Sequence, residues 1–291
     1  MKVAIYNRSF YKEESEFIRS VFCFLAEKKY EVIVNANLLS LFPNSSYFEK
    51  NEDLKKAGHL DFFLSLGGDR TLLESANIVR DLQIPIVGIN TGRIGFLTGV
   101  NKNDFATAFQ LLSEGAYLIE DRTLLHLETE YINAFSCNFA LNDITLHASR
   151  DALLNTIKVW INDKLLNTYW ADGLIVATPS GSTAYSLSCG GPIIAPDSKV
   201  NVITPIASHS LSVRPIVVSS DVVIKVEMSG RAENFLLTLD HHRTELPNPA
   251  TITISKELFT IKTVRFADRD FFTVIREKLM WGMDRRNNCK F

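Results

Sequence analysis

The sequence predicts two domains, an α/β domain followed by a β-rich domain. In residues 1–115, short apolar strands alternate with amphipathic helical segments, a pattern that indicates a parallel sheet covered on both faces. Beyond residue 115 the chain changes to short stretches of β-branched residues separated by turn formers, which is typical of antiparallel β structure. The length of 291 residues suits two domains of roughly 150 residues each.

The α/β domain is predicted element by element from its periodicity. Residues 13–29 predict a helix because their apolar side chains recur on one face. Residues 71–82 predict a second helix, with Thr71 as its N-cap. Turn-forming residues at 44–51 predict a loop. Apolar strands are expected at residues 3–7, 31–35, 61–66 and 85–90.

The β-rich domain is predicted from short stretches of strand-forming residues. Asn162 and Asp163 lie between two such stretches and predict a hairpin turn. Residues 270–281 return to a helical pattern that ends at Gly282, and the basic tail that follows is expected to be a solvated end. Strands are expected at residues 123–131, 135–147, 157–161, 174–177, 222–228, 235–239, 251–255 and 259–266.

Composition and charge exclude several classes of function. Hydrophobic residues make up 46% of the chain and charged residues 22%, an ordinary globular composition that excludes disorder as the main state. The formal net charge is −2, so no net positive field is available and neither a nucleic-acid nor a membrane partner is expected. No apolar run approaches the ~20 residues that span a bilayer, and the N-terminus lacks the apolar core of a signal peptide. A cytoplasmic location is therefore expected.

The cysteines and histidines predict neither a metal site nor a disulfide framework. The cysteines are far apart and form no C-x-x-C pair, which argues against a zinc ribbon and a secreted scaffold. His241 and His242 are adjacent, so in a strand their side chains would point apart, and a structural role is favoured over metal binding. No metal ligand is predicted. The cysteines are Cys23, Cys137, Cys189 and Cys289.

The first candidate motif, Gly67-Gly68-Asp69, follows a predicted strand and precedes a predicted helix. Ligands bind at the carboxyl ends of strands in open α/β sheets, and paired glycines with helix N–H groups let a phosphate approach closely. An aspartate there fits a proton acceptor for a hydroxyl, or a Mg²⁺ ligand. A tight turn with a capping aspartate is an equally good interpretation of this segment alone.

The second candidate motif, residues 90–97, also follows a predicted strand. Gly92 and Gly95 flank Arg93, and the segment continues into Phe96. This arrangement is consistent with one wall of a nucleotide pocket. An ordinary connecting loop is the favoured interpretation of the segment by itself.

The third candidate is the pair Asn142-Asp143, which interrupts an apolar strand. Because successive residues of a strand face opposite sides, both can meet one ligand only at a bulge or a strand end. The asparagine amide donates and accepts hydrogen bonds, and the carboxylate accepts from a ribose diol. A strand-end turn is the favoured interpretation in isolation.

The fourth candidate, residues 171–192, is the most specific. A buried strand runs into a dense set of hydroxyl-bearing residues, glycines and one tyrosine. Such a segment supplies many small donors and acceptors at close backbone approach, and its apolar content is too low for a core segment. Interruption by Tyr185 and Leu187 argues against a disordered Ser/Gly linker.

These four motifs, in this order, resemble the NAD kinase family. The matched patterns are an LGGD loop, an NTG-x-x-GF loop, an N-[ED] pair and DGL-x-V-x-TP-x-GSTAYSLS-x-GGP. Residues 209–215 are similar to the family's H-[ST]-L-x-x-RP element, so the resemblance spans nearly the whole chain. Residues 178–188 carry its most specific part, whereas the GGD pattern is shared with diacylglycerol, sphingosine and 6-phosphofructo-kinases.

The resemblance implies a fold, a reaction and partners. The implied fold has an α/β domain at residues 1–115, a β-rich NAD-binding domain at 116–267, and a C-terminal helix in 268–291 that returns to the first domain. The implied reaction transfers the γ-phosphoryl group of ATP, or a phosphoryl group of polyphosphate, to the 2′-hydroxyl of the adenosine ribose of NAD⁺, which gives NADP⁺. NAD⁺ and ATP are the implied partners, with Mg²⁺ held mainly by the ATP phosphates, in a homodimer or homotetramer.

The resemblance also assigns roles by motif position. Asp69 is the implied base for the 2′-hydroxyl, Asn142 and Asp143 would bind the ribose of NAD, and Asp172 would hold its nicotinamide side. Ser180, Thr183, Tyr185 and Ser188 would line the adenine and ribose pocket. The implied NAD-binding set is Gly68, Asp69, Arg70, Leu73, Phe96, Asn142, Asp143, Asp172, Ser180, Thr183, Ala184, Tyr185 and Ser188.

The chain departs from the family pattern at Arg70, Cys189 and Ser208, where the family has glycine, usually alanine and commonly proline. Glycine after the aspartate commonly serves a positive φ or a close approach, and an arginine with a left-handed backbone would cost roughly 1–2 kcal/mol. The favoured expectation is that Arg70 fills the path of the donor phosphate, and the other is that it clamps the phosphates. Two alternatives therefore stand beside an NAD kinase: a catalytically weakened NAD(P)-binding paralogue, and another GGD-loop kinase acting on a lipid or on 6-phosphofructose.

Overall fold

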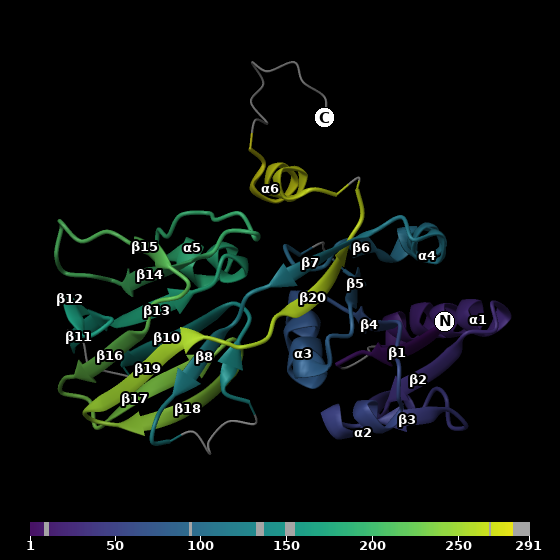
Figure 1. Cartoon of the computed structure of the whole chain (residues 1–291), viewed down its shortest axis with the longest axis horizontal. Helices are drawn as coiled ribbons and strands as arrows, with labels where there is room; N and C mark the ends of the chain where they lie inside the picture. The colour runs from purple at the N-terminus through teal and green to yellow at the C-terminus, as the bar shows by residue number, and fades with distance from the viewer. Residues whose placement is uncertain (9–11, 93–94, 132–136, 149–154, 268, 282–291) are drawn as a thin grey trace. The chain divides into compact units, whose positions relative to one another are not determined.

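The computed structural model of the chain describes residues 1–8, 12–92, 95–131, 137–148, 155–267 and 269–281 (Figure 1). Its contacts divide the chain into two compact units. Unit 1 comprises Met1–Asp121 and Ile261–Phe291, and unit 2 comprises Arg122–Thr260. The predicted helix end at Gly282 and the basic tail lie outside the described residues.

Unit 1 is built on a mostly parallel sheet of eight strands in the order β3-β2-β1-β4-β5-β20-β7, with β6 paired to β5. The last strand to join, β20, comes from the end of the chain and lies between β5 and β7 (Figure 1). Every residue of β4 and β5 is buried, as expected for central strands covered on both faces. The strands are β1 (Lys2–Tyr6), β2 (Glu31–Asn35), β3 (Ser46–Phe48), β4 (Phe62–Leu66), β5 (Ile86–Asn90), β6 (Val100–Asn101), β7 (Leu118–Arg122) and β20 (Ile261–Arg265).

The helices of unit 1 confirm the predicted periodicity and correct some of its boundaries. The helix expected at 71–82 begins earlier, because Gly68 takes the extended N-cap conformation in place of Thr71. The loop expected at 44–51 contains strand β3 and ends where α2 begins. Two further helices, α2 and α4, had no prediction. The helices are α1 (Lys12–Glu27), α2 (Asn51–Lys56), α3 (Asp69–Val79), α4 (Phe105–Glu114) and α6 (Phe271–Leu279).

Unit 2 consists of two six-stranded antiparallel sheets, which confirms the β-rich prediction. The first has the order β15-β14-β13-β10-β17-β18, and the second has the order β12-β11-β16-β19-β8-β9. The first sheet contains β10 (Asp143–Ala148), β13 (Gly173–Ala177), β14 (Val200–Ile206), β15 (Ile216–Ser219), β17 (Asn234–Leu239) and β18 (His242–Pro247). The second contains β8 (Leu125–Glu128), β9 (Phe139–Ala140), β11 (Asn155–Ile161), β12 (Lys164–Ala171), β16 (Ile224–Ser229) and β19 (Ala250–Lys256).

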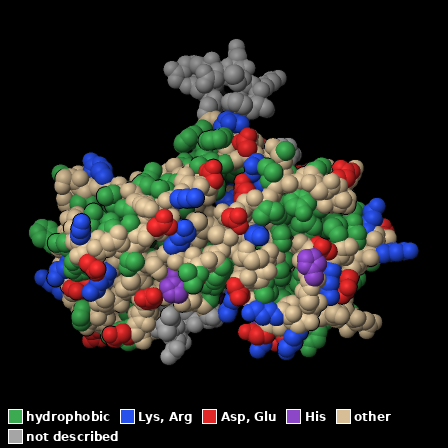
Figure 2. Space-filling model, in the orientation of Figure 1, with side chains coloured by type: hydrophobic (Ala, Val, Ile, Leu, Met, Phe, Trp, Pro, Cys, Tyr) green, Lys and Arg blue, Asp and Glu red, His purple; other side chains and the backbone are tan. Residues whose placement is uncertain are grey.

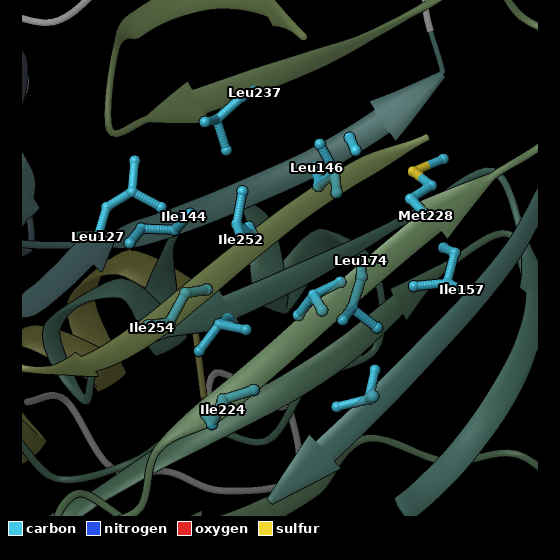
Figure 3. Packing of buried hydrophobic residues seen from close by; sticks show 14 of the residues in the cluster. Leu127, Ile144, Leu146, Ile157, Leu174, Ile224, Met228, Leu237, Ile252 and Ile254 are labelled. Carbon is cyan, nitrogen blue, oxygen red and sulfur yellow. The ribbon is translucent and has the colours of Figure 1, made fainter. Parts of the chain in front are cut away.

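The core of unit 2 joins its two sheets. Ile144, Leu146 and Leu237 from the first sheet share one buried cluster with residues of the second, such as Ile157 and Ile252 (Figure 3). The predicted hairpin turn is confirmed, since Ile161 pairs with Lys164 and both intervening residues have positive φ. The predicted strand at 259–266 is β20, which joins the sheet of unit 1.

Two observations describe the surface charge and the lengths of the helices. On the face shown in Figure 2, basic and acidic side chains are interspersed, with no large area of one sign. Among the described residues, no helix is long and apolar enough to cross a membrane.

Candidate functional site

The Gly67–Asp69 loop connects the carboxyl end of β4 to the start of α3. Gly67 has φ +152°, and a Cβ atom there would lie 2.2 Å from the Thr71 hydroxyl, so a larger residue does not fit. Gly68 is extended and caps α3, which leaves the first N–H groups of this 11-residue helix without helical partners. The sequence motif thus places a close backbone approach and helix N–H donors at one strand end.

Asp69 connects the first two sequence motifs directly. Its Oδ2 accepts a hydrogen bond from the Phe96 N–H at 2.8 Å. Its Oδ1 accepts from the Leu97 N–H at 3.1 Å, and from the N–H and hydroxyl of Thr98, both at 3.2 Å. A Cβ atom at Gly95 would lie 1.6 Å from Oδ1. The carboxylate therefore holds the 95–98 loop, and glycine at position 95 makes that contact possible.

The rest of the second motif is held by its own polar groups. The Asn90 side chain donates to the Thr98 hydroxyl at 2.9 Å and accepts from the Gly92 N–H at 2.7 Å. Thr91 donates to Glu14 at 2.7 Å. Arg93 and Ile94 lie outside the described residues. On either side of these two residues the segment is held by hydrogen bonds, and its Phe96 N–H is already bonded to Asp69.

Arg70 lies in the first turn of α3 with a helical backbone, so the expected left-handed strain is wrong. Its Nε is 3.7 Å from the Glu74 carboxylate one turn along the helix, and its side chain is 56% exposed. Glu74 also accepts from the Tyr6 hydroxyl at 2.8 Å and pairs with Arg8 at 2.9 Å. Burial, followed by the Glu74 carboxylate, raises the pKa of Tyr6. Leu73 is buried on the same helix.

In unit 2, the Asn142-Asp143 pair lies where a strand begins, as the strand-end interpretation predicts. Strand β10 starts at Asp143 and pairs with β13 and β17. Asp143 is 6% exposed, and its Oδ1 accepts from the Thr145 hydroxyl at 3.1 Å. Burial, and then the neighbouring Asp240, raise the pKa of Asp143 to about 7. The pair therefore presents one amide and one carboxyl that titrates near neutrality.

Residues 178–188 leave β13 as two short helical segments, η5 (Ser180–Thr183) and α5 (Tyr185–Ser188). The expectation that their hydroxyls lie outside the core is partly wrong. Ser182 and Ser186 are fully buried, and they bond to the Pro179 carbonyl at 2.7 Å and to the Thr204 hydroxyl at 2.8 Å. These hydroxyls hold the segment together rather than facing a ligand.

The remaining predicted residues of this segment differ in exposure. Tyr185 is 45% exposed and Ser188 is exposed, whereas Thr183 and Ala184 are half-buried. Ser180 is buried, with its hydroxyl 3.5 Å from the Arg122 guanidinium. Residues 183–185 and 188 therefore expose more of their surface to a ligand than Ser180 does.

Asp172, Tyr185 and Cys189 are further polar groups near this segment. Asp172 has one buried carboxylate oxygen with no hydrogen-bond partner among the described residues. Burial raises the pKa values of Tyr185 and Cys189, with smaller contributions from neighbouring acidic groups. Cys189 is a free, half-buried thiol, and its raised pKa disfavours a reactive thiolate.

His241 and His242 do not lie together in one strand. His241 lies in the turn between β17 and β18, so its ring and that of His242 lie against each other with centroids 4.0 Å apart. The prediction that they point apart is therefore wrong. Among the described residues, no group of three or more His, Cys, Asp or Glu side chains is arranged to hold a metal ion.

Sequence reasoning missed two residues that hold the Asn142-Asp143 pair. Thr178 donates from its N–H to the Asn142 carbonyl at 2.9 Å and from its hydroxyl to the Leu141 carbonyl at 2.6 Å. Asp240 accepts from three N–H groups of residues 141–143. The only sequence signal for Asp240 was a polar residue between two strands, which is typical of any turn.

Comparison with known protein families gives matches over both units. The ATP-NAD kinase N-terminal domain matches residues 4–117, and the ATP-NAD kinase C-terminal domain matches residues 141–266. The NAD kinase of Flavobacterium psychrophilum is 39% identical over 296 residues, which covers 99% of this chain and 100% of that protein. The NAD kinase of Christiangramia forsetii is 38% identical over 297 residues, with coverage of 99% and 100%.

Solved structures agree with these matches. A yeast NADH kinase complexed with NADH has a TM-score of 0.85 at 25% identity and covers 97% of this chain and 88% of its own. An NAD kinase from Archaeoglobus fulgidus in complex with ATP has a TM-score of 0.74 at 25% identity, with coverage of 96% and 99%. The fold similarity therefore extends over nearly the whole chain.

Proposed function

This chain belongs to the NAD kinase family, and from that membership we propose that it transfers the γ-phosphoryl group of ATP to the 2′-hydroxyl of the adenosine ribose of NAD⁺. The product is NADP⁺. The full-length relatives do not favour the alternatives of a lipid kinase, a 6-phosphofructo-kinase or a weakened binding paralogue.

The observation that carries this proposal is the fit between the Asn142-Asp143 pair and the segment after β13. A Cβ atom at Gly181 would lie 1.9 Å from the Asn142 carbonyl oxygen, so only glycine lets the two backbones meet this closely. Thr178 fixes the carbonyls of the same residues. The two polar side chains are thereby fixed relative to residues 183–185, an arrangement suited to a ribose and its attached base.

Asp69 is the proposed base for the 2′-hydroxyl. Phosphoryl transfer is catalysed mainly by positioning and charge stabilisation, so the base needs a fixed orientation. Oδ1 accepts three hydrogen bonds from the loop, whereas Oδ2 accepts one. A carboxylate oxygen has about two lone-pair sites, so Oδ2 retains one for a substrate hydroxyl.

The remaining proposed NAD contacts follow the matched motifs. Gly68 contributes backbone at the start of α3, Phe96 the adjoining loop, and Arg70 and Leu73 the first turns of the helix. Asp172 is proposed for the nicotinamide side, since its buried oxygen has no partner among the described residues. Ser180, Thr183, Ala184, Tyr185 and Ser188 are proposed for the adenine and ribose.

We propose that Mg²⁺ enters the site bound to the phosphates of ATP. The described residues form no cluster of three metal ligands, and three of the four hydrogen bonds that Asp69 accepts go to its Oδ1, so this part of the chain offers no dedicated cage. Mg²⁺ keeps several waters and binds readily through nucleotide phosphates, where it neutralises developing charge. A cytoplasmic location and a homodimer or homotetramer are proposed from the family resemblance.

Turnover with a panel of donors and acceptors tests this proposal. Purified protein with ATP, Mg²⁺ and NAD⁺ should form NADP⁺, and polyphosphate and NADH define the donor and acceptor range. Calorimetric titration with NAD⁺ is run in parallel. Binding of NAD⁺ without turnover under any donor would favour the binding paralogue. Phosphorylation of a diacylglycerol or a sugar phosphate instead of NAD⁺ would exclude the proposed function.

A further inference from the structure

Asp240 occupies the tip of a hairpin beside the Asn142-Asp143 pair. Leu239 pairs with His242, so Asp240 and His241 form a two-residue loop between β17 and β18. Asp240 has φ +51°, a conformation that glycine, asparagine and aspartate adopt most readily. The backbone of the turn alone would therefore accept any of these three residues.

The Asp240 carboxylate accepts every backbone N–H of the segment that carries the pair. Oδ2 accepts from the Leu141 N–H at 2.9 Å, and Oδ1 accepts from the Asn142 and Asp143 N–H groups at 2.7 and 3.1 Å. In return, the Asp240 N–H donates to the Asp143 carbonyl at 3.0 Å. The hairpin tip and the segment are thus joined by four hydrogen bonds.

Thr178 completes the backbone bonding from the other side. Its hydroxyl and N–H satisfy the carbonyls of Leu141 and Asn142. All three N–H groups and all three carbonyls of residues 141–143 are therefore bonded to Asp240 or Thr178. The backbone has no polar group left over, so the side chains of Asn142 and Asp143 are the groups that remain for a ligand.

These contacts explain why the turn residue is an aspartate. Three converging N–H groups require an acceptor with two oxygens, and only an ionised carboxylate provides acceptors without a donor. Glycine would leave the three N–H groups without this partner. Asparagine would direct its NH₂ group at one of them, which is a repulsive contact between donors.

We propose that Asp240 is a positioning residue for NAD binding, which fixes the backbone of residues 141–143 so that Asn142 and Asp143 meet the ribose. This role rests on the proposed NAD kinase function. Asp240 acts through the pair and does not itself contact the substrate. The hairpin between β17 and β18 is thereby assigned a part in substrate recognition.

The two carboxyl groups also influence each other electrically. Burial and then the charge of Asp240 raise the pKa of Asp143 to about 7. Burial also raises the pKa of Asp240, to about 6, although its three hydrogen bonds from backbone N–H groups act to lower it. Among the described residues, Tyr185 and Cys189 also interact with Asp143, and burial raises the pKa of both. Ribose hydroxyls donate to an ionised Asp143, so NAD⁺ affinity should rise as the pH rises through about 7.

Kinetics of Asp240→Asn and Asp240→Glu, compared with the wild type, test the role. Asp163→Asn is the matched control, because Asp163 also has a positive φ in a two-residue hairpin loop of unit 2 but is exposed. The KM for NAD⁺, the KM for ATP and kcat are measured on both sides of pH 7, with circular dichroism to verify folding. The wild type is measured first, since absence of NADP⁺ formation there would refute the proposed function itself.

Asp240→Asn should raise the KM for NAD⁺ about tenfold or more, while the KM for ATP and kcat stay within about twofold. Loss of the Asp240 charge should also move the pH midpoint for NAD⁺ binding to lower pH. Asp240→Glu should also raise the KM for NAD⁺, but because it keeps the charge it should not move the pH midpoint. If the Asn variant does not fold, the Glu variant tests the role in its place. Asp163→Asn should change none of these values. An unchanged KM for NAD⁺ and an unchanged midpoint in a folded Asp240→Asn protein would overturn the role, even if its melting temperature fell.

Discussion

Asp69 has a structural role that neither interpretation of its own segment predicted. Its carboxylate holds the distant 95–98 loop through four hydrogen bonds, and one Oδ2 lone pair remains for the proposed catalytic role. The two roles support each other, because the loop fixes the direction in which Oδ2 faces. A base held in this way needs no reorganisation when the hydroxyl arrives.

Asp69→Asn should lower kcat far more than it weakens NAD⁺ binding. The amide cannot take the 2′-hydroxyl proton, and loss of a positioned base typically costs about 10²–10⁴-fold in rate. Asparagine keeps the size of the side chain, but its NH₂ group must face either the Phe96 N–H or the N–H groups of Leu97 and Thr98, so only the contacts to its remaining oxygen should persist. Steady-state kinetics and NAD⁺ titration on the same preparation separate the two effects. A variant with nearly full kcat would show that Asp69 only caps the loop.

Arg70→Gly should raise kcat/KM for ATP several-fold and change NAD⁺ affinity little. Arg70 has an ordinary helical backbone, and its exposed contact with Glu74 is of a kind worth about 0–1 kcal/mol, so the guanidinium is free to move into the path of the donor phosphates. Arg70→Ala controls for the added flexibility of glycine in a helix. A fall in kcat/KM for ATP in both variants would identify Arg70 as a phosphate ligand.

Among the elements, the loop after β5 lies directly against the start of α3, and the contact is between Gly95 and Asp69. Gly95→Ala should lower kcat by about 10²-fold, because a Cβ atom 1.6 Å from Asp69 Oδ1 must displace the carboxylate. It should also destabilise the fold by roughly 1–3 kcal/mol. Gly99→Ala is the control, since a Cβ atom there meets nothing within 4 Å. Equal kcat values for the two variants would separate this loop from catalysis.

Many of the helices and strands could be predicted from the sequence. Strong apolar runs specify strands that are buried on both faces, such as β4 and β5. Strands with weak patterns were missed for physical reasons. Pro205 lies inside β14, where a proline normally argues against a strand, and β18 is polar on its exposed face. Tertiary pairing decides the conformation at both places.

The candidate site was only partly predictable for a related reason. Sequence motifs identify residues whose side chains differ from their surroundings, such as Asp69 and the Asn142-Asp143 pair. They do not identify partners that are distant in sequence, and Asp240 lies 97 residues from Asp143. Nor do they separate the hydroxyls that bond internally, such as Ser182, from those that remain accessible.

In the whole molecule, unit 1 includes the end of the chain, whereas unit 2 is one continuous segment. The two units should therefore differ in whether they fold without the rest of the chain. A chain that ends at Thr260 lacks β20, an internal strand between β5 and β7 whose Ile261 and Val264 are buried. Its unit 1 should therefore lose cooperative unfolding. Residues 122–260, which contain both sheets of unit 2 and their shared core, should fold alone. Thermal unfolding followed by circular dichroism measures both, and a cooperative unit 1 without β20 would contradict this view.

The position of the new phosphate on the product shows whether the enzyme phosphorylates the 2′-hydroxyl of NAD⁺. The protein is incubated with ATP, Mg²⁺ and NAD⁺, or with the 2′-deoxyadenosine analogue of NAD⁺, and the products are identified by phosphorus NMR and mass spectrometry. The expected product of NAD⁺ carries a single phosphate on the 2′-oxygen of the adenosine ribose, and the analogue should not be phosphorylated. A phosphate at another position, or an analogue phosphorylated as readily as NAD⁺, would contradict it.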